Sequence, residues 1–182
     1  MNSTSVRQRY SSLSIALHWV MVVLMTAVYA TILLRENYPR GTDIREGLKT
    51  WHFMLGLAVL TLVIIRLIAR FASRAPAITP QPSAAQALLA KVTHLALYAF
   101  MIAMPIAGWM ILSAEGKAIP FFGLELPALT GPNESLAEQV EELHELTGTV
   151  GYYLIGLHAL AALFHHYVIK DNTLLRMMPG RR

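Results

Sequence analysis

Four long apolar stretches run through the sequence and constrain its fold more than any other feature. Each holds at least 20 residues, and they lie at 15–34, 51–71, 92–114 and 146–169. A helix needs about 20 mostly apolar residues to cross a bilayer, and none of the stretches alternates with the period of two that membrane strands show. The sequence therefore predicts an all-α fold, a transmembrane four-helix bundle with helices at these positions.

The composition of the chain points the same way. Apolar residues make up 55% of the 182 residues and charged residues 14%, with a mean hydropathy of +0.47. Soluble domains average about 25% charged residues, so a soluble domain and a disordered chain are both excluded. The length predicts a single integral membrane domain over residues 1–182. Because the first stretch is longer than the core of a signal peptide, we expect it to be retained.

Lysine and arginine residues are unevenly divided between the two sides of the predicted bundle. The side that holds both termini carries ten of them, whereas the other side carries five against ten carboxylates. Positive charge favours the cytoplasmic side of a membrane, so we expect both termini in the cytoplasm. The net charge of +4 then reports orientation, and we expect no nucleic-acid partner.

Histidines are the most informative residues in the apolar stretches. The chain has seven of them and no cysteine, which excludes thiolate metal sites and covalently attached c-type haem. His52 and His144 lie near the outer ends of their predicted helices, and His18 and His158 lie in the inner half. His144 and His158 are 14 residues apart, which is about 21 Å along a helix and nearly four full turns, so they share one face.

These positions predict two histidine pairs at two depths, one of His52 with His144 and one of His18 with His158. Two histidines on facing helices can supply both axial nitrogens of an iron porphyrin, and haem b is apolar enough for a bundle core. Two haems at two depths would form an electron path across the bilayer. Glycines that could leave room for a macrocycle are Gly56, Gly148, Gly151 and Gly156.

The remaining histidines allow two interpretations. His94 and His165 lie toward the cytoplasmic side, where a histidine often reaches the interface as a solvated residue. Reduction of a quinone needs protons as well as electrons, and histidine titrates near neutral pH. His94 or His165 could therefore bind a quinone head group or relay its protons. A histidine relay for protons or metal ions in a transporter is a further, colourless alternative.

Two segments resemble the bacterial cytochrome b561 family. They are LSIALHWVMVVL at residues 13–24 and GYYLIGLHALAALFHHYVIKDNTLLRMMP at residues 151–179, of which the KDNTLLRMMP tail is the more specific. The resemblance covers essentially the whole chain. It implies a four-helix di-haem b cytochrome of the bacterial inner membrane, with iron ligands at His18, His52, His144 and His158.

The same resemblance implies an activity, superoxide:ubiquinone oxidoreduction. Superoxide would give an electron to the outer haem, and the inner haem would pass electrons to ubiquinone near the cytoplasmic face. Two histidines on each iron leave no open coordination position, so the reaction would be outer-sphere electron transfer without a catalytic side chain. No protein partner would be required beyond the lipid bilayer.

The acidic outer side conflicts with an anionic substrate, because anion capture favours a positive surface. We therefore expect a local basic group beside the outer haem, drawn from Arg35, Arg40, Arg45, Lys49 and Lys117, of which Arg45, Lys49 and Lys117 are the main candidates. The alternative of a different class is an electron-transferring membrane-anchor subunit of a dehydrogenase or hydrogenase.

Overall fold

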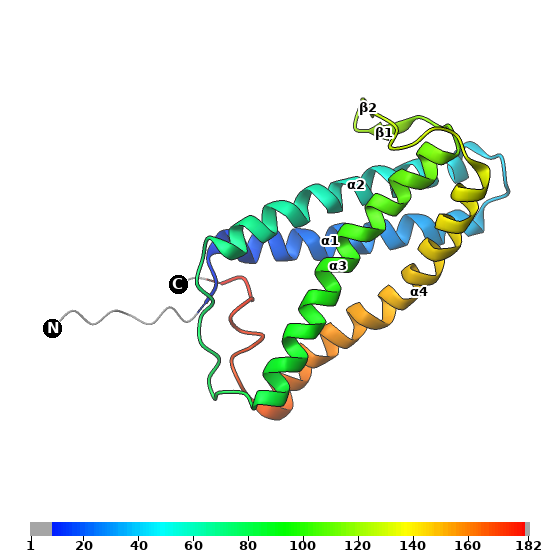
Figure 1. Ribbon diagram of the computed structural model, residues 1–182. Coiled ribbons are helices and arrows are strands. Elements are labelled where there is room, and N and C mark those ends of the chain that lie inside the picture. The colour runs from blue at the N-terminus through cyan, green and yellow to red at the C-terminus, as the bar shows by residue number, and fades with distance from the viewer. Residues whose placement is uncertain (1–8, 181–182) are drawn as a thin grey trace.

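The computed structural model describes residues 9–180 and consists of four long helices (Figure 1). All four are long and apolar enough to cross a membrane, as the sequence predicts. A short 3₁₀ turn follows the first helix and a π-helical turn ends the last. The elements are α1 (Ser12–Leu34), η1 (Arg35–Asn37), α2 (Asp43–Phe71), α3 (Ala84–Ala114), α4 (Glu134–Phe164) and η2 (His165–Ile169).

The helices begin earlier than their apolar stretches, and the first three end where those stretches end, whereas the last stretch finishes in η2. Three of the four starts are capped by a polar side chain that accepts a backbone hydrogen bond, whereas Thr42 precedes α2 without one. The side chain of Ser11 accepts a hydrogen bond from the backbone of Ser14, and Asn133 does the same for Leu136. Ser83 and Gln86 form a reciprocal capping box at the start of α3. Hydropathy detects only the part of a helix that lipid surrounds, so the polar first turns fall outside the predicted bounds.

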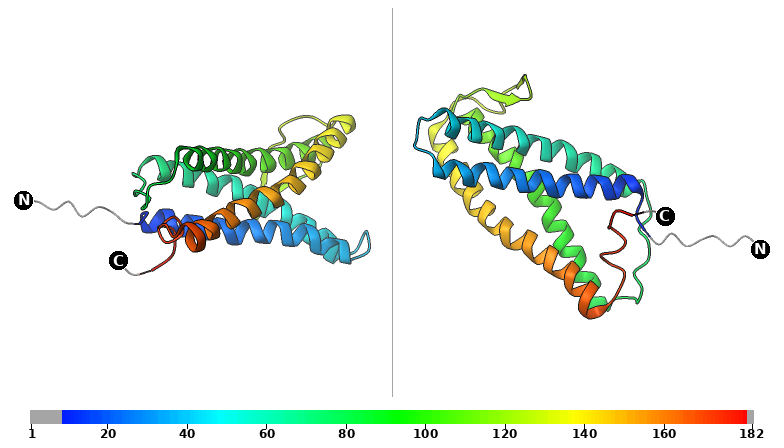
Figure 2. Two further views of the ribbon diagram at one scale, coloured as in Figure 1. Left: turned by 90° about the horizontal axis from the view of Figure 1, so that it is seen from below. Right: turned by 180° about the vertical axis from the view of Figure 1, so that it is seen from behind.

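The bundle is an open one, formed by two helix pairs. α1 packs along α2, α3 packs along α4, and α2 also contacts α3. The two pairs stay close at one end, here called the outer end. They diverge toward the end where α1 begins and α4 ends, here called the inner end (Figures 1 and 2). Within the described residues, no Cα atom of α4 comes within 8 Å of one in α1 or α2. The backbone of α4 is therefore joined to the α1–α2 pair through side chains, such as Tyr29, which donates to the carbonyl of Gly148.

Two clusters of buried apolar side chains hold α1, α2 and α3 together. Met21, Val59 and Val63 form the first, against which Tyr98 of α3 packs. The second joins α2 and α3 at the outer end through residues that include Leu57 and Leu112. Many other large apolar side chains are exposed, such as Phe71 at 84%, which is expected where lipid is the solvent.

A small hairpin caps the outer end and was not predicted from the sequence. Its strands β1 (Ile119–Phe121) and β2 (Leu124–Leu126) pair antiparallel. Phe122 and Gly123 make the turn with φ values of 48° and 88°, a two-residue connection whose backbone twist suits a hairpin. The side chain of Trp109 donates to the carbonyl of Pro127 at 2.9 Å and ties the loop that follows to α3.

Residues 170–179, here called the C-terminal segment, close the inner end of the bundle. Asn172 makes three hydrogen bonds to the α2–α3 linker, to Ala77 and to both backbone groups of Thr79. The indole of Trp19 donates to the carbonyl of Met177 at 2.8 Å. The segment thus joins α1, α4 and the linker across the opening between the two helix pairs (Figure 2).

Candidate functional site

His52 of α2 and His144 of α4 face each other in the outer half of the bundle. Their ring centroids are 6.3 Å apart with the ring planes at 77°. Nδ1 of His52 lies 3.0 Å from the carbonyl oxygen of Val28, and because a carbonyl only accepts, Nδ1 carries the proton and donates. Nε2 of His52 is therefore left with a free lone pair. Histidines that ligate metals commonly have their second nitrogen fixed in this way.

A cavity of about 380 Å³ lies between these two histidines. Cavities of about 300–1,000 Å³ commonly hold small molecules and cofactors. Gly56, Gly108 and Gly148 line it together with mostly apolar side chains. Nδ1 of His144 is buried and has no hydrogen-bond partner among the described residues. Buried polar atoms are almost always paired, so this unpaired nitrogen is compatible with a group bound in the cavity.

His18 of α1 and His158 of α4 face each other in the inner half. Their ring centroids are 6.4 Å apart with the planes at 83°, so the inner pair nearly repeats the geometry of the outer one. Each pair links α4 to α1 or α2, although in the described part of the chain no Cα atom of α4 lies within 8 Å of a Cα atom in either helix. The two depth-matched pairs expected from the sequence are therefore brought together across the open side of the bundle.

The spacing within each pair fits two imidazoles on opposite sides of one metal ion. With metal–nitrogen bonds of about 2.0–2.1 Å, the ring centroids of such a pair would lie roughly 6.4 Å apart. Within residues 9–180, no group of three or more histidine, cysteine, aspartate or glutamate side chains is arranged to hold a metal ion. Each pair could therefore hold the iron of a b-type haem, which would need only these two histidines from the chain.

Three aromatic residues separate the two pairs at mid-depth. Gly151 lies seven residues from both His144 and His158, about 10 Å from each along α4. A Cβ atom at Gly151 would collide with the Phe100 ring and the Tyr29 hydroxyl. Tyr29 donates to the carbonyl of Gly148 at 2.8 Å, and its ring lies 4.3 Å from that of Tyr152.

The four glycines expected to leave room for a macrocycle therefore differ in role. Gly56 and Gly148 line the outer cavity, and nothing lies within 4 Å of a Cβ atom built at Gly56 or Gly156. At Gly151, by contrast, Phe100 and Tyr29 occupy the space that a side chain at this position would need.

Of the other histidines, only His94 joins the inner pair. Its ring centroid lies 5.4 Å from that of His158, so three histidines from α1, α3 and α4 gather there. His165 lies in η2, where its Nδ1 is 2.6 Å from the buried carboxylate of Asp171. Burial acts to raise the pKa of Asp171, but hydrogen bonds from His165 and the backbone of Thr173 prevail and hold it below its ordinary value.

A basic cavity of about 320 Å³ shares a wall with the apolar cavity that holds the outer histidine pair. Its walls carry four cationic side chains against two carboxylates, and Arg35 lines both this cavity and the apolar one. Lys49 reaches toward the apolar cavity, with its ammonium 5.7 Å from the Phe53 ring centroid. The charged residues are Arg35, Arg40, Arg45, Lys49, Glu46 and Glu141.

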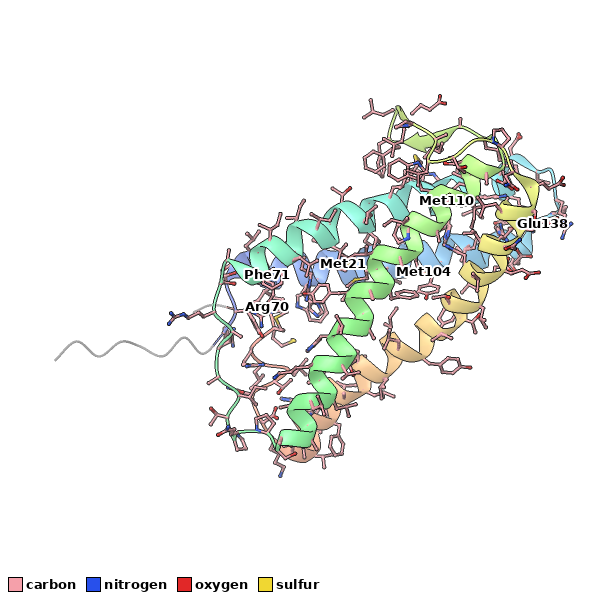
Figure 3. All side chains as sticks on the ribbon, viewed as in Figure 1. Met21, Arg70, Phe71, Met104, Met110 and Glu138 are labelled. Carbon is pink, nitrogen blue, oxygen red and sulfur yellow. The ribbon has the colours of Figure 1, made fainter. Side chains whose placement is uncertain are left out.

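The predicted basic group is thus present for Arg45 and Lys49 but does not include Lys117. Lys117 follows α3 and pairs with Glu115 at 3.0 Å. Arg45 is held by the carbonyls of Arg35 and Tyr38, both at 2.9 Å, and by Glu36. The acidic residues of the early turns of α4, such as Glu138, lie at the outer end of that helix (Figure 3).

Sequence reasoning missed Arg66 and Arg176, which it counted only as cytoplasmic charges. Nη1 of Arg66 and Nε of Arg176 are buried without hydrogen-bond partners in the described part of the chain. A signal existed for Arg66, because it follows His52 by 14 residues, the same interval that separates His144 from His158. For Arg176, which follows the last helix, no spacing rule applied.

Several known proteins are similar to this chain over nearly its whole length. A family model described as prokaryotic cytochrome b561 matches residues 9–180. The chain is 41% identical over 177 residues to the probable superoxide oxidase CybB of Yersinia pestis, covering 97% of this chain and 99% of the relative. It is 37% identical to cytochrome b561 homolog 1 of Escherichia coli, covering 96% and 99%. Cytochrome b562 of Cereibacter sphaeroides is 31% identical, covering 94% and 96%.

Proposed function

The chain belongs to the prokaryotic cytochrome b561 family and is a membrane electron-transfer protein, and we propose that it holds two b-type haems, one at each histidine pair. The observation that carries the proposal is the repeated spacing of 6.3 Å and 6.4 Å in two histidine pairs that span the open side of the bundle. When bound, haem supplies an iron that cycles between ferric and ferrous states.

The histidines would hold each iron from both sides, and the protein would thereby restrict the reaction to electron transfer. With both axial positions taken, neither oxygen nor a substrate could ligate the metal. His52 would be kept in one tautomer by its hydrogen bond to Val28. Tyr29, Phe100 and Tyr152 would exclude water from the region between the two sites, because their side chains fill the bundle at mid-depth.

We propose superoxide as the electron donor at the outer side. A relative with 41% identity is named a probable superoxide oxidase. The basic cavity supports this donor, since its four cationic side chains outnumber the two carboxylates of its lining and Glu36, which pairs with Arg35 and Arg45. Local positive charge raises the concentration of a small anion and its rate of encounter. The local charge of this cavity is therefore opposite in sign to that of the outer side as a whole.

The proposed acceptor is ubiquinone near the cytoplasmic end. Two superoxide anions would each lose one electron and leave as oxygen, while one quinone gains two electrons and two protons to become a quinol. The distribution of lysine and arginine favours cytoplasmic termini, which puts His18, His94 and His158 in the inner half of the membrane. His94 is the closest candidate for a residue that binds the quinone or passes it a proton, because its ring contacts that of His158.

Stopped-flow mixing of the purified protein with superoxide, in the presence of ubiquinone, tests the proposed reaction. We expect rapid reduction of the cytochrome and formation of one quinol for every two superoxide anions consumed. Reduction no faster than that of an unrelated cytochrome, together with co-purification of a dehydrogenase, would point instead to a membrane-anchor subunit.

Charge variants separate guided capture of superoxide from random encounter. Replacing Arg40 and Lys49 with glutamine should lower the second-order rate constant by roughly tenfold at low ionic strength, and the difference should shrink in high salt. Lys91→Gln, an exposed position near the other end of the bundle, is the matched control and should leave the rate unchanged. Equal rates for all three proteins would reject the basic cavity as the capture site.

A further inference from the structure

Unpaired arginine nitrogens gather at the inner end of the bundle. Among the described residues, the buried arginine nitrogens without a hydrogen-bond partner belong to Arg9, Arg66 and Arg176. Arg66 is on α2, Arg9 precedes α1 and Arg176 belongs to the C-terminal segment. Three chain segments thus bring unsatisfied cations to one end of the molecule.

Arg66 lies inside the apolar part of α2, one and a half turns before the helix ends at Phe71. Its guanidinium is near enough to His18, His94 and His158 to interact with each of them electrostatically. A charged side chain at such a depth is costly and usually has a partner of opposite charge. The sequence has no aspartate or glutamate between Glu46 and Glu115, the stretch that holds Arg66 and His94.

Arg176 of the C-terminal segment lies near one of these histidines, His94. Only 7% of its surface is exposed. One guanidinium nitrogen donates to the carbonyl of Pro76, and the group lies 5.5 Å from the ring centroid of Tyr10. Its Nε has no hydrogen-bond partner in the described structure, although its charge lies near His94. Arg70, labelled in Figure 3, adds a further cation 6.0 Å from the same ring centroid.

No acidic side chain is free to neutralise these arginines. Asp171 is the one aspartate or glutamate in the sequence that lies beyond the inner ends of the helices. Its carboxylate is already bound by His165 and by the backbone N–H of Thr173. Arg176 is buried, and Arg66 is half-buried with its Nη1 shielded from solvent. Because a shielded charge without a counter-ion is destabilising, the arrangement favours an anion from outside the chain.

We infer that Arg66 and Arg176 form a carboxylate-binding site for the propionate groups of the haem held by His18 and His158. Haem b carries two propionates, and the planar fork of arginine is matched to a carboxylate. The C-terminal segment is then part of the inner haem site and not only a cover over it. The inference rests on the proposed function, because it requires a haem at this histidine pair.

A carboxylate fits this position better than the other molecules that reach the inner end. A quinone head group is neutral and leaves the excess positive charge in place. The phosphate of a lipid lies at the membrane surface, whereas Arg66 lies within the helix and beside His18 and His158. A propionate is attached to the group that these histidines hold, so it reaches Arg66 without a separate binding event.

Reconstitution with haem b and with its dimethyl ester tests the inference, because the ester has the same macrocycle without the negative charges. The full-length chain is prepared without haem, with His144→Ala so that only the inner pair binds, and affinity is measured by absorbance titration. The parent protein should bind haem b roughly 10- to 100-fold more tightly than the ester, as expected for charge-assisted hydrogen bonds. Arg66→Gln and Arg176→Gln should each reduce this ratio to about threefold or less.

Two further variants keep the result unambiguous. Arg74→Gln removes an exposed arginine from the same end of the bundle and should retain the parent ratio. Arg66→Lys keeps the charge but not the fork, so an intermediate ratio is expected even if the glutamine variant fails to fold. An unchanged ratio in the Arg66 and Arg176 variants would overturn the inference alone. Failure of the inner pair to bind haem at all would overturn the proposed function with it.

Discussion

Replacing Gly151 with alanine should destabilise the bundle, although alanine is the better helix former. A Cβ atom at this position would lie 2.7 Å from Cε2 of Phe100, and closer still to Cζ of that ring and to the hydroxyl of Tyr29. Ordinary contacts begin near 3.4 Å, so both side chains must move. Phe100 is only 9% exposed, and Tyr29 is held by its hydrogen bond to the carbonyl of Gly148.

The expected cost follows from these contacts. Overpacking a well-filled interior costs about 1–3 kcal/mol, and the loss of the Tyr29 hydrogen bond adds about 1 kcal/mol. Alanine returns about 1 kcal/mol through its higher helix propensity. The free energy of unfolding should therefore fall by about 2 kcal/mol, which is a change of roughly 30-fold in the folding equilibrium.

Denaturant unfolding in detergent, followed by tryptophan fluorescence, measures the effect. Gly47→Ala is the matched control, because Gly47 also lies within a helix and nothing is within 4 Å of a Cβ atom built there; it should be neutral or stabilising. Phe100→Leu in the Gly151→Ala background should restore part of the loss by making room. If Gly151→Ala is as stable as Gly47→Ala, the mid-depth packing described here is wrong.

Three further predictions concern the inner end and a helix start. Asp171→Asn should weaken hydrogen-exchange protection of residues 171–177 about tenfold or more at pH 7. Because the native pKa of Asp171 is lowered, the extra protection in the wild type is present above the ordinary pKa of about 3.9 and is lost as the pH falls through the native value. A difference in protection that does not shrink as the pH is lowered would contradict this prediction. Trp19→Phe removes the hydrogen bond to Met177 and should speed limited proteolysis of the C-terminal segment several-fold, with unchanged cleavage contradicting that anchor. Ser83→Ala breaks the capping box of α3 and should cost about 1 kcal/mol in thermal unfolding, whereas Ser12→Ala, one residue inside the N-cap of α1, should cost less.

The helices could be predicted from the sequence because lipid imposes a simple requirement. A crossing segment must be apolar over its whole length, so the stretches that end at Leu34, Phe71 and Ala114 coincide with the ends of α1, α2 and α3. The polar first turns of α2 and α4 lie outside this requirement, and only that of α4 has a side-chain cap, from Asn133. The β1–β2 hairpin depends on a short turn at Gly123 that hydropathy does not detect.

The histidine pairs could also be anticipated, since depth along a straight helix is fixed by residue number. Residue number and helical period could not predict which helices lie side by side. His94 was expected near the cytoplasmic surface, yet the packing of α3 on α4 brings it beside His158. The approach of Arg176 depends on the fold of the C-terminal segment against the linker, which is a tertiary effect.

Haem content per chain, measured by pyridine haemochromogen assay on purified protein, tests the central claim most directly. The proposal of one haem at each histidine pair predicts two haems per chain in the wild-type protein. His158→Ala should lose the inner haem and retain the outer one, and His52→Ala should do the reverse. A wild-type protein without a b-type absorption band, or a His158→Ala variant that still carries two haems, would contradict the proposal.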